Sequence, residues 1–188
     1  MKKIIFMIGV LFSFALPVQA AETYTLDPMH TYVLWHVNHF GFSNPSGKWM
    51  ATGTLVLDEA KPQNSKVNVT IQIANMITGI PQLDEHLKGK VFFDVAQYPI
   101  ATFVSDKIKI TGKKSAQVKG MLTLHGVTKP VILAVTLNKI GVSPISNKKT
   151  VGFTAKTNLK RSDFDITTLL PGLSDEVKID IEAEAVQT

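Results

Sequence analysis

Histidines and the carboxylates near them are the residues of this sequence that could support catalysis or metal binding. The chain has five histidines. His30 follows Asp27 by three residues, and His39 follows His36 by the same spacing. In a strand this spacing places two side chains on opposite faces, so His36 and His39 do not readily share a metal ion. The ligand spacing typical of zinc sites is absent. One alternative stays open: a small enzyme or metal-binding protein that uses His30, His39 and Asp27.

Sequence patterns of known catalytic sites are absent. The sequence has no G-x-S-x-G, no H-E-x-x-H and no glycine-rich phosphate loop. It has no cysteine, which excludes a thiol nucleophile, an iron–sulfur cluster and a disulfide framework. We therefore predict that the protein is not an enzyme and that it holds neither a metal nor a catalytic cofactor.

Residues 1–20 have the three parts of a secretory signal peptide. Lys2 and Lys3 begin it, an apolar run follows, and the small residue Ala20 ends it. The apolar run is short for a membrane-spanning helix, which needs about 20 residues. We expect cleavage after Ala20 and export to the periplasm, which leaves residues 21–188 as a single domain.

The charge balance is weakly positive, with 20 Lys and Arg against 15 Asp and Glu. Two of these lysines belong to the expected signal peptide, and the others are spread along the chain. A small and dispersed excess of positive charge argues against a nucleic-acid partner. The sequence leaves open a transient contact with a membrane surface and the formation of a homodimer.

Alternation of apolar and polar residues predicts that residues 21–188 are almost entirely β-structure. Each alternating strand has one buried face and one face in water. The alternation covers 67–73, 131–137, 151–159 and 177–185, and further strands fit 31–39, 48–57, 100–110 and 116–124. The stretch Pro81–Gly89 is different, because it begins with proline, carries early acids and ends with glycine. It predicts a short helix.

About eight strands fit either a sandwich of two sheets or a closed antiparallel barrel, and periodicity alone does not choose between them. An eight-stranded barrel is just wide enough to hold one small ligand. An outer-membrane barrel also fits the length, but such barrels carry aromatic girdles, and this chain has only three Tyr and two Trp.

Several blocks of residues, in the same order along the chain, resemble the YceI-like family of lipocalin-like, polyisoprenoid-binding periplasmic proteins. The blocks are Asp27 to Gly41, Thr78 to Ser105, the segment Gly120 to Val131 with the sequence GMLTLHGVTKPV, and Arg161 to Phe164. Two positions depart from the family pattern: Thr31 stands where serine is frequent, and Leu83 stands where arginine is frequent.

This resemblance implies an all-β fold, an antiparallel eight-stranded lipocalin-like barrel with a short helix in a connection. It implies an apolar tunnel that binds a long-chain lipid for carriage or storage: a polyisoprenoid, an isoprenoid quinone or a fatty-chain amphiphile. Burial contributes about 0.8 kcal/mol per CH₂ group, so such a ligand needs few polar contacts.

The residues predicted to take part in binding come from the matching blocks and from the aromatic residues. The predicted ligand-binding residues are Val33, Trp35, Val37, His39, Phe40, Phe42, Phe92, Phe93, Phe103, Phe153, Arg161 and Phe164. The polar residues predicted either to have a structural role or to lie at the tunnel mouth are Asp27, His30, Asp84 and His86. Arg161 is the candidate for a polar head group, because its planar guanidinium suits oxygen acceptors.

Overall fold

The computed structural model describes residues 21–188, so the expected signal peptide lies outside the described residues. The strands are β1 (Glu22–Leu26), β2 (Tyr32–His39), β3 (Ser46–Leu57), β4 (Lys66–Ile71), β5 (Ala101–Ile110), β6 (Ser115–Leu124), β7 (Val127–Val142), β8 (Lys149–Lys160) and β9 (Leu173–Gln187). The helix α1 spans Pro81–Lys88, and the short 3₁₀ helices are η1 (Pro62–Asn64), η2 (Ile73–Asn75) and η3 (Arg161–Phe164). The predicted short helix is confirmed.

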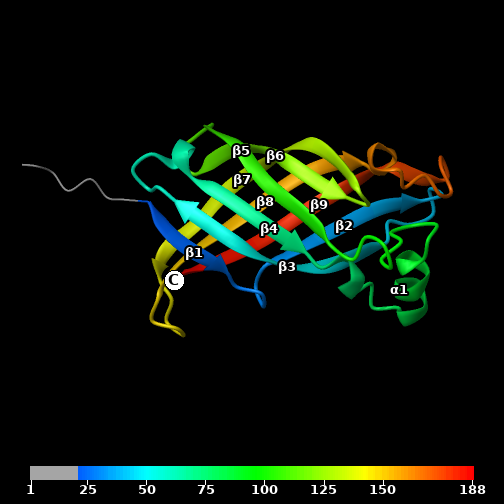
Figure 1. Ribbon diagram of the computed structural model, residues 1–188, viewed down its shortest axis with the longest axis horizontal. Helices are drawn as coiled ribbons and strands as arrows, with labels where there is room; N and C mark the ends of the chain where they lie inside the picture. Colours follow the sequence, from blue (N-terminus) through cyan, green and yellow to red (C-terminus); the bar gives the residue numbers. More distant parts are fainter. Residues whose placement is uncertain (1–20) are drawn as a thin grey trace, which may run out of the picture.

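The strands form one antiparallel sheet that closes on itself (Figure 1). The hydrogen-bonded order is β1-β3-β2-β9-β8-β7-β6-β5-β4, and β3 also pairs with β4. This second pairing closes an eight-stranded ring from β2 to β9. The extra strand, β1, pairs with β3 and β9, which are also the neighbours of β2. β1 and β2 therefore share one position in the wall, and the predicted eight-stranded antiparallel barrel is confirmed.

The alternation within each strand decides which side chains point into the barrel. In β9, Ile179 and Ala185 are buried, whereas Lys178 and Asp180 form an ion pair on the outer face. Apolar residues inside and charged residues outside are the reverse of the arrangement in outer-membrane barrels, whose lipid-facing surface is apolar. Separately, none of the helices within residues 21–188 is long and apolar enough to cross a membrane.

A tight turn joins β6 to β7. Leu124 pairs with Val127, so His125 and Gly126 form a two-residue turn, with φ of 51° and 76°. Positive φ at both positions gives the type of turn whose twist matches that of the flanking strands. His125 Nδ1 lies 3.0 Å from the carbonyl oxygen of Phe164, and this contact ties the turn to η3. His125 therefore has a structural role.

Thr31 joins the break between β1 and β2 to strand β9. Its buried hydroxyl donates a hydrogen bond to the carbonyl oxygen of Glu184, at 3.0 Å, and accepts one from the amide of Glu184, at 3.2 Å. The amide of Asp27 donates to the same carbonyl, at 2.8 Å. The threonine hydroxyl thus replaces backbone pairing where neither β1 nor β2 supplies it.

We expect Thr31→Val to lower the free energy of unfolding by about 1–3 kcal/mol, because the valine buries no hydroxyl to pair with the amide and the carbonyl of Glu184. Valine has nearly the shape of threonine, so the packing changes little. Urea unfolding followed by tryptophan fluorescence measures the difference. Thr31→Ser is the matched control, since it keeps the hydroxyl and should retain most of the stability. Equal stability of the valine variant and the wild type would contradict this role of Thr31.

Helix α1 lies at one end of the elongated barrel, and the C-terminus lies towards the other end (Figure 1). Pro81 is the first residue of α1, where a missing amide hydrogen is tolerated, and Gly89 follows its last residue. Leu87 packs into the hydrophobic core below the helix. The helix therefore covers one end of the space that the strands enclose.

Candidate functional site

An apolar cavity of about 790 Å³ occupies the interior of the barrel. Its lining extends from His39 and His86 at the α1 end to Glu59 and Lys113 at the opposite end. Between the two ends, every strand of the ring contributes inward-facing side chains, nearly all of them apolar. The volume lies within the range of about 300–1,000 Å³ that is typical of sites for small molecules.

Most of the predicted ligand-binding residues line this cavity. They are Val33, Trp35, Val37, His39, Phe92, Phe93, Phe103, Phe153, Arg161 and Phe164. Those on β2, β5 and β8 point inward because they share the period of the buried face. His39 is exposed and lies at the α1 end of the lining. The structure thus brings these residues together around one apolar space.

The prediction that Phe40 and Phe42 line the tunnel is wrong. Their side chains are 46% and 90% exposed, and both residues follow the last residue of β2. Phe40 takes a positive φ of 54°, so the extended backbone ends there and the inward alternation ends with it. Its ring packs edge-on against His39 and over Gly172.

The α1 end of the cavity carries exposed apolar side chains. Phe42 lies between β2 and β3, Ile80 precedes α1, Val91 follows α1, and Leu169 lies between η3 and β9. The hydroxyl of Thr168 hydrogen-bonds to the carbonyl oxygen of Val91, which holds two of these connections together. Leu169 also belongs to the cavity lining. Apolar surface is therefore continuous from the cavity to the outside at this end.

Arg161 is held by three backbone carbonyl groups. Its Nε donates to Ser174 at 2.9 Å, its Nη1 to Ile166 at 2.9 Å and its Nη2 to Leu173 at 2.8 Å. Burial lowers the pKa of the guanidinium, and the nearby carboxylate of Asp175 offsets part of this effect. These contacts fix the loop between η3 and β9. They use three of the five N–H donors of the guanidinium, so binding of a polar head group by Arg161 stays a prediction.

Of the four polar residues predicted to have a structural role or to lie at the mouth, one belongs to the cavity lining. His86 lines the cavity. The carboxylate of Asp84 instead accepts hydrogen bonds from the amide and the hydroxyl of Thr78, at 2.8 and 2.6 Å, and fixes the loop before α1. Asp27 and His30 lie at the break between β1 and β2 and do not belong to the lining. For these three residues the contacts fit the structural alternative of the prediction and not a position in the lining, because local backbone and turn contacts determine where they lie.

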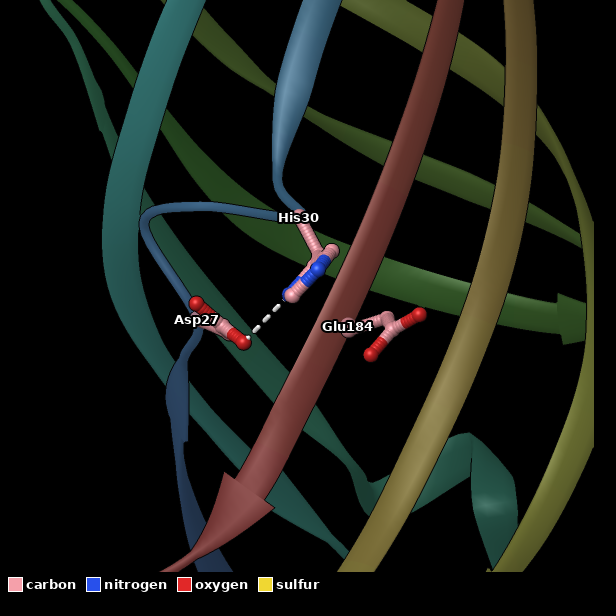
Figure 2. Close-up of side chains that lie close together, drawn as sticks. All are labelled: Asp27, His30 and Glu184. Carbon is pink, nitrogen blue, oxygen red and sulfur yellow. Dashed lines mark hydrogen bonds and ion pairs between the residues drawn. The ribbon is translucent and has the colours of Figure 1, made fainter. Parts of the chain in front are cut away.

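Asp27 and His30 instead form a pair beside Glu184 of β9 (Figure 2). His30 Nδ1 lies 2.7 Å from Asp27 Oδ2, and the other carboxylate oxygen of Asp27 accepts the amide of Met29 at 2.9 Å. Potential ligand atoms of Asp27, His30 and Glu184 lie within 4.8 Å of one another, so within residues 21–188 this group could hold a divalent metal ion. His39 is about 25 Å away along the extended strand β2. One site therefore cannot use Asp27, His30 and His39 together.

The Asp27–His30 hydrogen bond shifts both titrations. It raises the pKa of His30 and lowers the pKa of Asp27. A raised histidine pKa stabilises the fold below about pH 6.5, and this contribution is lost as the pH rises through the folded-state pKa. A lowered aspartate pKa stabilises it above about pH 4, and this contribution is lost as the pH falls through the folded-state pKa. The pair therefore stabilises the protein most between about pH 4 and pH 6.5.

We expect Asp27→Asn to lower the melting temperature more at pH 5.5 than at pH 8.5. Asparagine can still accept the amide of Met29, but it removes the charge that favours protonated His30. Thermal unfolding of the variant and the wild type at both pH values, in low salt, measures the difference. Differences of equal size at the two pH values would show that the pair does not contribute through its charge.

Trp49 is a lining residue that the sequence analysis did not single out. It lies on β3, with its ring centroid 5.9 Å from that of Trp35 and 5.4 Å from that of Phe93. The signal that could have found it is the alternation that places Trp49, Ala51 and Leu55 on one face. The contact with Trp35 depends on the pairing of β2 with β3, which periodicity does not give.

Comparison with known proteins extends over nearly the whole barrel. A sequence model of the YceI-like domain matches residues 24–185. The chain is 39% identical over 170 residues to a UPF0312 protein of Pseudomonas savastanoi pv. phaseolicola, across 89% of this chain and 88% of that protein. The crystal structure of Burkholderia cenocepacia BcnA is similar with a TM-score of 0.76 and 26% identity, across 85% of this chain and 98% of that one. A polyisoprenoid binding domain from Saccharophagus degradans, implicated in plant cell wall breakdown, shares the fold with a TM-score of 0.68 and 16% identity, across 88% and 98%.

Proposed function

The chain belongs to the YceI-like domain family, and we propose that it binds a long-chain apolar lipid inside its barrel, for carriage or storage in the periplasm. The observation that carries this proposal is the apolar cavity of about 790 Å³. The Saccharophagus domain with the same fold is described as polyisoprenoid binding, which supports it. The candidate ligands are a polyisoprenoid, an isoprenoid quinone and a fatty-chain amphiphile.

Burial of hydrocarbon supplies most of the affinity in this proposal. About ten buried CH₂ groups contribute roughly 8 kcal/mol, before the cost of ordering the ligand is subtracted. Apolar walls discriminate weakly between chains, by about 1–3 kcal/mol per methylene. We therefore expect several lipids of similar length to compete for the cavity.

We further propose that the protein acts after removal of its signal peptide and that it catalyses no reaction. The few polar groups of the lining support this, since the middle of the cavity offers little to activate a nucleophile or a water molecule. The separation of His39 from Asp27 and His30 also argues against the alternative enzyme site, because its members do not converge.

A quenching titration tests lipid binding. The chain has two tryptophans, and both line the cavity. We expect ubiquinone added to the delipidated mature protein to quench their fluorescence and to saturate at one molecule per barrel. The alkane of matching length should compete with it. Fluorescence that does not change, or that falls without saturation, would contradict binding in the cavity.

We expect lipid to enter at the α1 end, so Phe42→Ser should slow the transfer of quinone from vesicles to the protein. Phe42 is 90% exposed, so its loss should change the free energy of unfolding by no more than about 0.5 kcal/mol. Exposed aromatic side chains insert readily into a lipid surface. Ile145→Ser is the matched control, because Ile145 is 94% exposed in the β7–β8 connection, away from α1. Stopped-flow quenching measures both rates, and equal rates for the two variants would contradict entry at this end.

A further inference from the structure

Two hydrogen-bond donors in the cavity wall have no partner in the described part of the chain. Trp35 and Trp49 are each only 6% exposed, and the Nε1 of neither ring has a hydrogen-bond acceptor within residues 21–188. Buried indole N–H groups usually have an acceptor, because an unmatched buried donor destabilises the protein. An indole nitrogen only donates, so the group that would match it is an acceptor.

The two rings lie side by side on the wall formed by β2 and β3. Trp35 is paired with Gly47, and Val33 is paired with Trp49, so the two indoles point inward from neighbouring positions of adjacent strands. A Cβ atom at Gly47 would lie only 2.7 Å from Nε1 of Trp35. Because glycine has no side chain, the nitrogen-bearing edge of the Trp35 ring packs directly over the backbone of Gly47, where no side chain supplies an acceptor.

The surroundings of the two indoles are apolar. Ile179 is paired with Trp35 on the other side of β2, Val33 is paired with Trp49, and Phe93 packs edge-on against Trp49. These side chains carry no hydrogen-bond acceptor. None of these neighbouring side chains therefore supplies the missing acceptor, and a ligand in the cavity that both tryptophans line can supply it.

We propose that Trp35 and Trp49 form a polar subsite inside the cavity, which binds an oxygen acceptor of the lipid, such as a quinone, ester or amide carbonyl. This inference rests on the proposed function and narrows its ligand class from hydrocarbon chains to lipids that carry a hydrogen-bond acceptor. The subsite lies in the α1 half of the barrel. It selects against lipids without oxygen, since an unmatched buried donor discriminates more strongly than an apolar wall does.

Indole N–H signals in the NMR spectrum of ¹⁵N-labelled mature protein test the subsite directly. The chain has only two tryptophans, so Trp35→Phe and Trp49→Phe assign both signals. The probes are phylloquinone, which has two ring carbonyls on a phytyl chain, and phytane, which has the same chain without oxygen. We expect phylloquinone to move the indole proton signals downfield, as a new hydrogen bond does, and phytane to move them little. Indole signals that respond equally to both probes would overturn the inference.

Affinity gives a second readout. The variant with phenylalanine at both positions should bind phylloquinone about tenfold more weakly and phytane about as well as the wild type does. An equal loss of affinity for both probes would show that the tryptophans act through packing, and unchanged affinity for both would show that no polar subsite exists. Either result overturns the inference, whereas the proposal of lipid binding stands. A wild-type protein that binds neither probe contradicts the proposed function itself. If the double variant does not fold, the wild-type spectra and the single variants still show whether the indole groups bind an acceptor of the lipid.

Discussion

Arg161→Met is expected to lower the free energy of unfolding by about 3 kcal/mol or more. The guanidinium makes three hydrogen bonds to backbone carbonyls, and bonds from a charged donor are stronger than those between neutral groups. Methionine fills much of the same space, but it leaves the carbonyls of Ile166, Leu173 and Ser174 without this donor. The loop between η3 and β9 then loses its main polar attachment.

Urea unfolding of this variant, next to Arg161→Lys, separates packing from hydrogen bonding. Lysine keeps the charge, but its single ammonium group cannot reach three carbonyls in the directions that the guanidinium serves, so we expect intermediate stability. A methionine variant that unfolds like the wild type, yet binds lipid much more weakly, would contradict the structural role. Such a result would indicate that Arg161 binds the head group of the ligand.

Phe153→Asp should weaken lipid binding about 100-fold or more, because it places a carboxylate in the apolar lining of the cavity. Phe153 lies on β8, between Leu137 and Ala183 in the sheet, and belongs to the lining. A lipid chain beside an aspartate must either bury the charge without a partner or leave room for water. Both alternatives weaken the complex, which quinone quenching measures directly.

Ala134→Asp is the matched control for this substitution. Ala134 is exposed on the outer face of β7, paired with Lys156, so an aspartate there stays in water beside a positive charge. Its affinity for quinone should equal that of the wild type. Circular dichroism confirms that both variants are folded at the temperature of the titration. Unchanged affinity in Phe153→Asp would remove this residue from the binding surface.

The sequence was sufficient to predict the eight strands of the ring and the inward-facing residues in their middle, but not β1. Val33, Trp35 and Val37 were correctly placed because a barrel strand has a single buried face, which period-two alternation records. The prediction failed at Phe40 and Phe42, where the chain leaves the sheet and a lining role was suggested by the resemblance and by the aromatic residue type. Aromatic residues in a connection can face water as readily as they face a cavity.

Long-range pairing could not be predicted from the sequence. The choice of a barrel over a sandwich depends on the β3–β4 pairing that closes the sheet. The hydrogen bonds of Thr31 with Glu184 join residues that are 153 positions apart. The partners of Arg161 are backbone carbonyls, which no pattern of side chains reveals. The role of Arg161 in holding the loop before β9 was therefore not predicted.

Native mass spectrometry of the mature protein, purified gently from the periplasm and then extracted with organic solvent, tests lipid binding most directly. We expect one long-chain lipid per barrel and, if the tryptophan subsite is correct, a lipid that carries a carbonyl oxygen. A protein that leaves the periplasm without lipid, and that remains empty after incubation with an isoprenoid quinone, would contradict the proposal that this barrel is a lipid carrier.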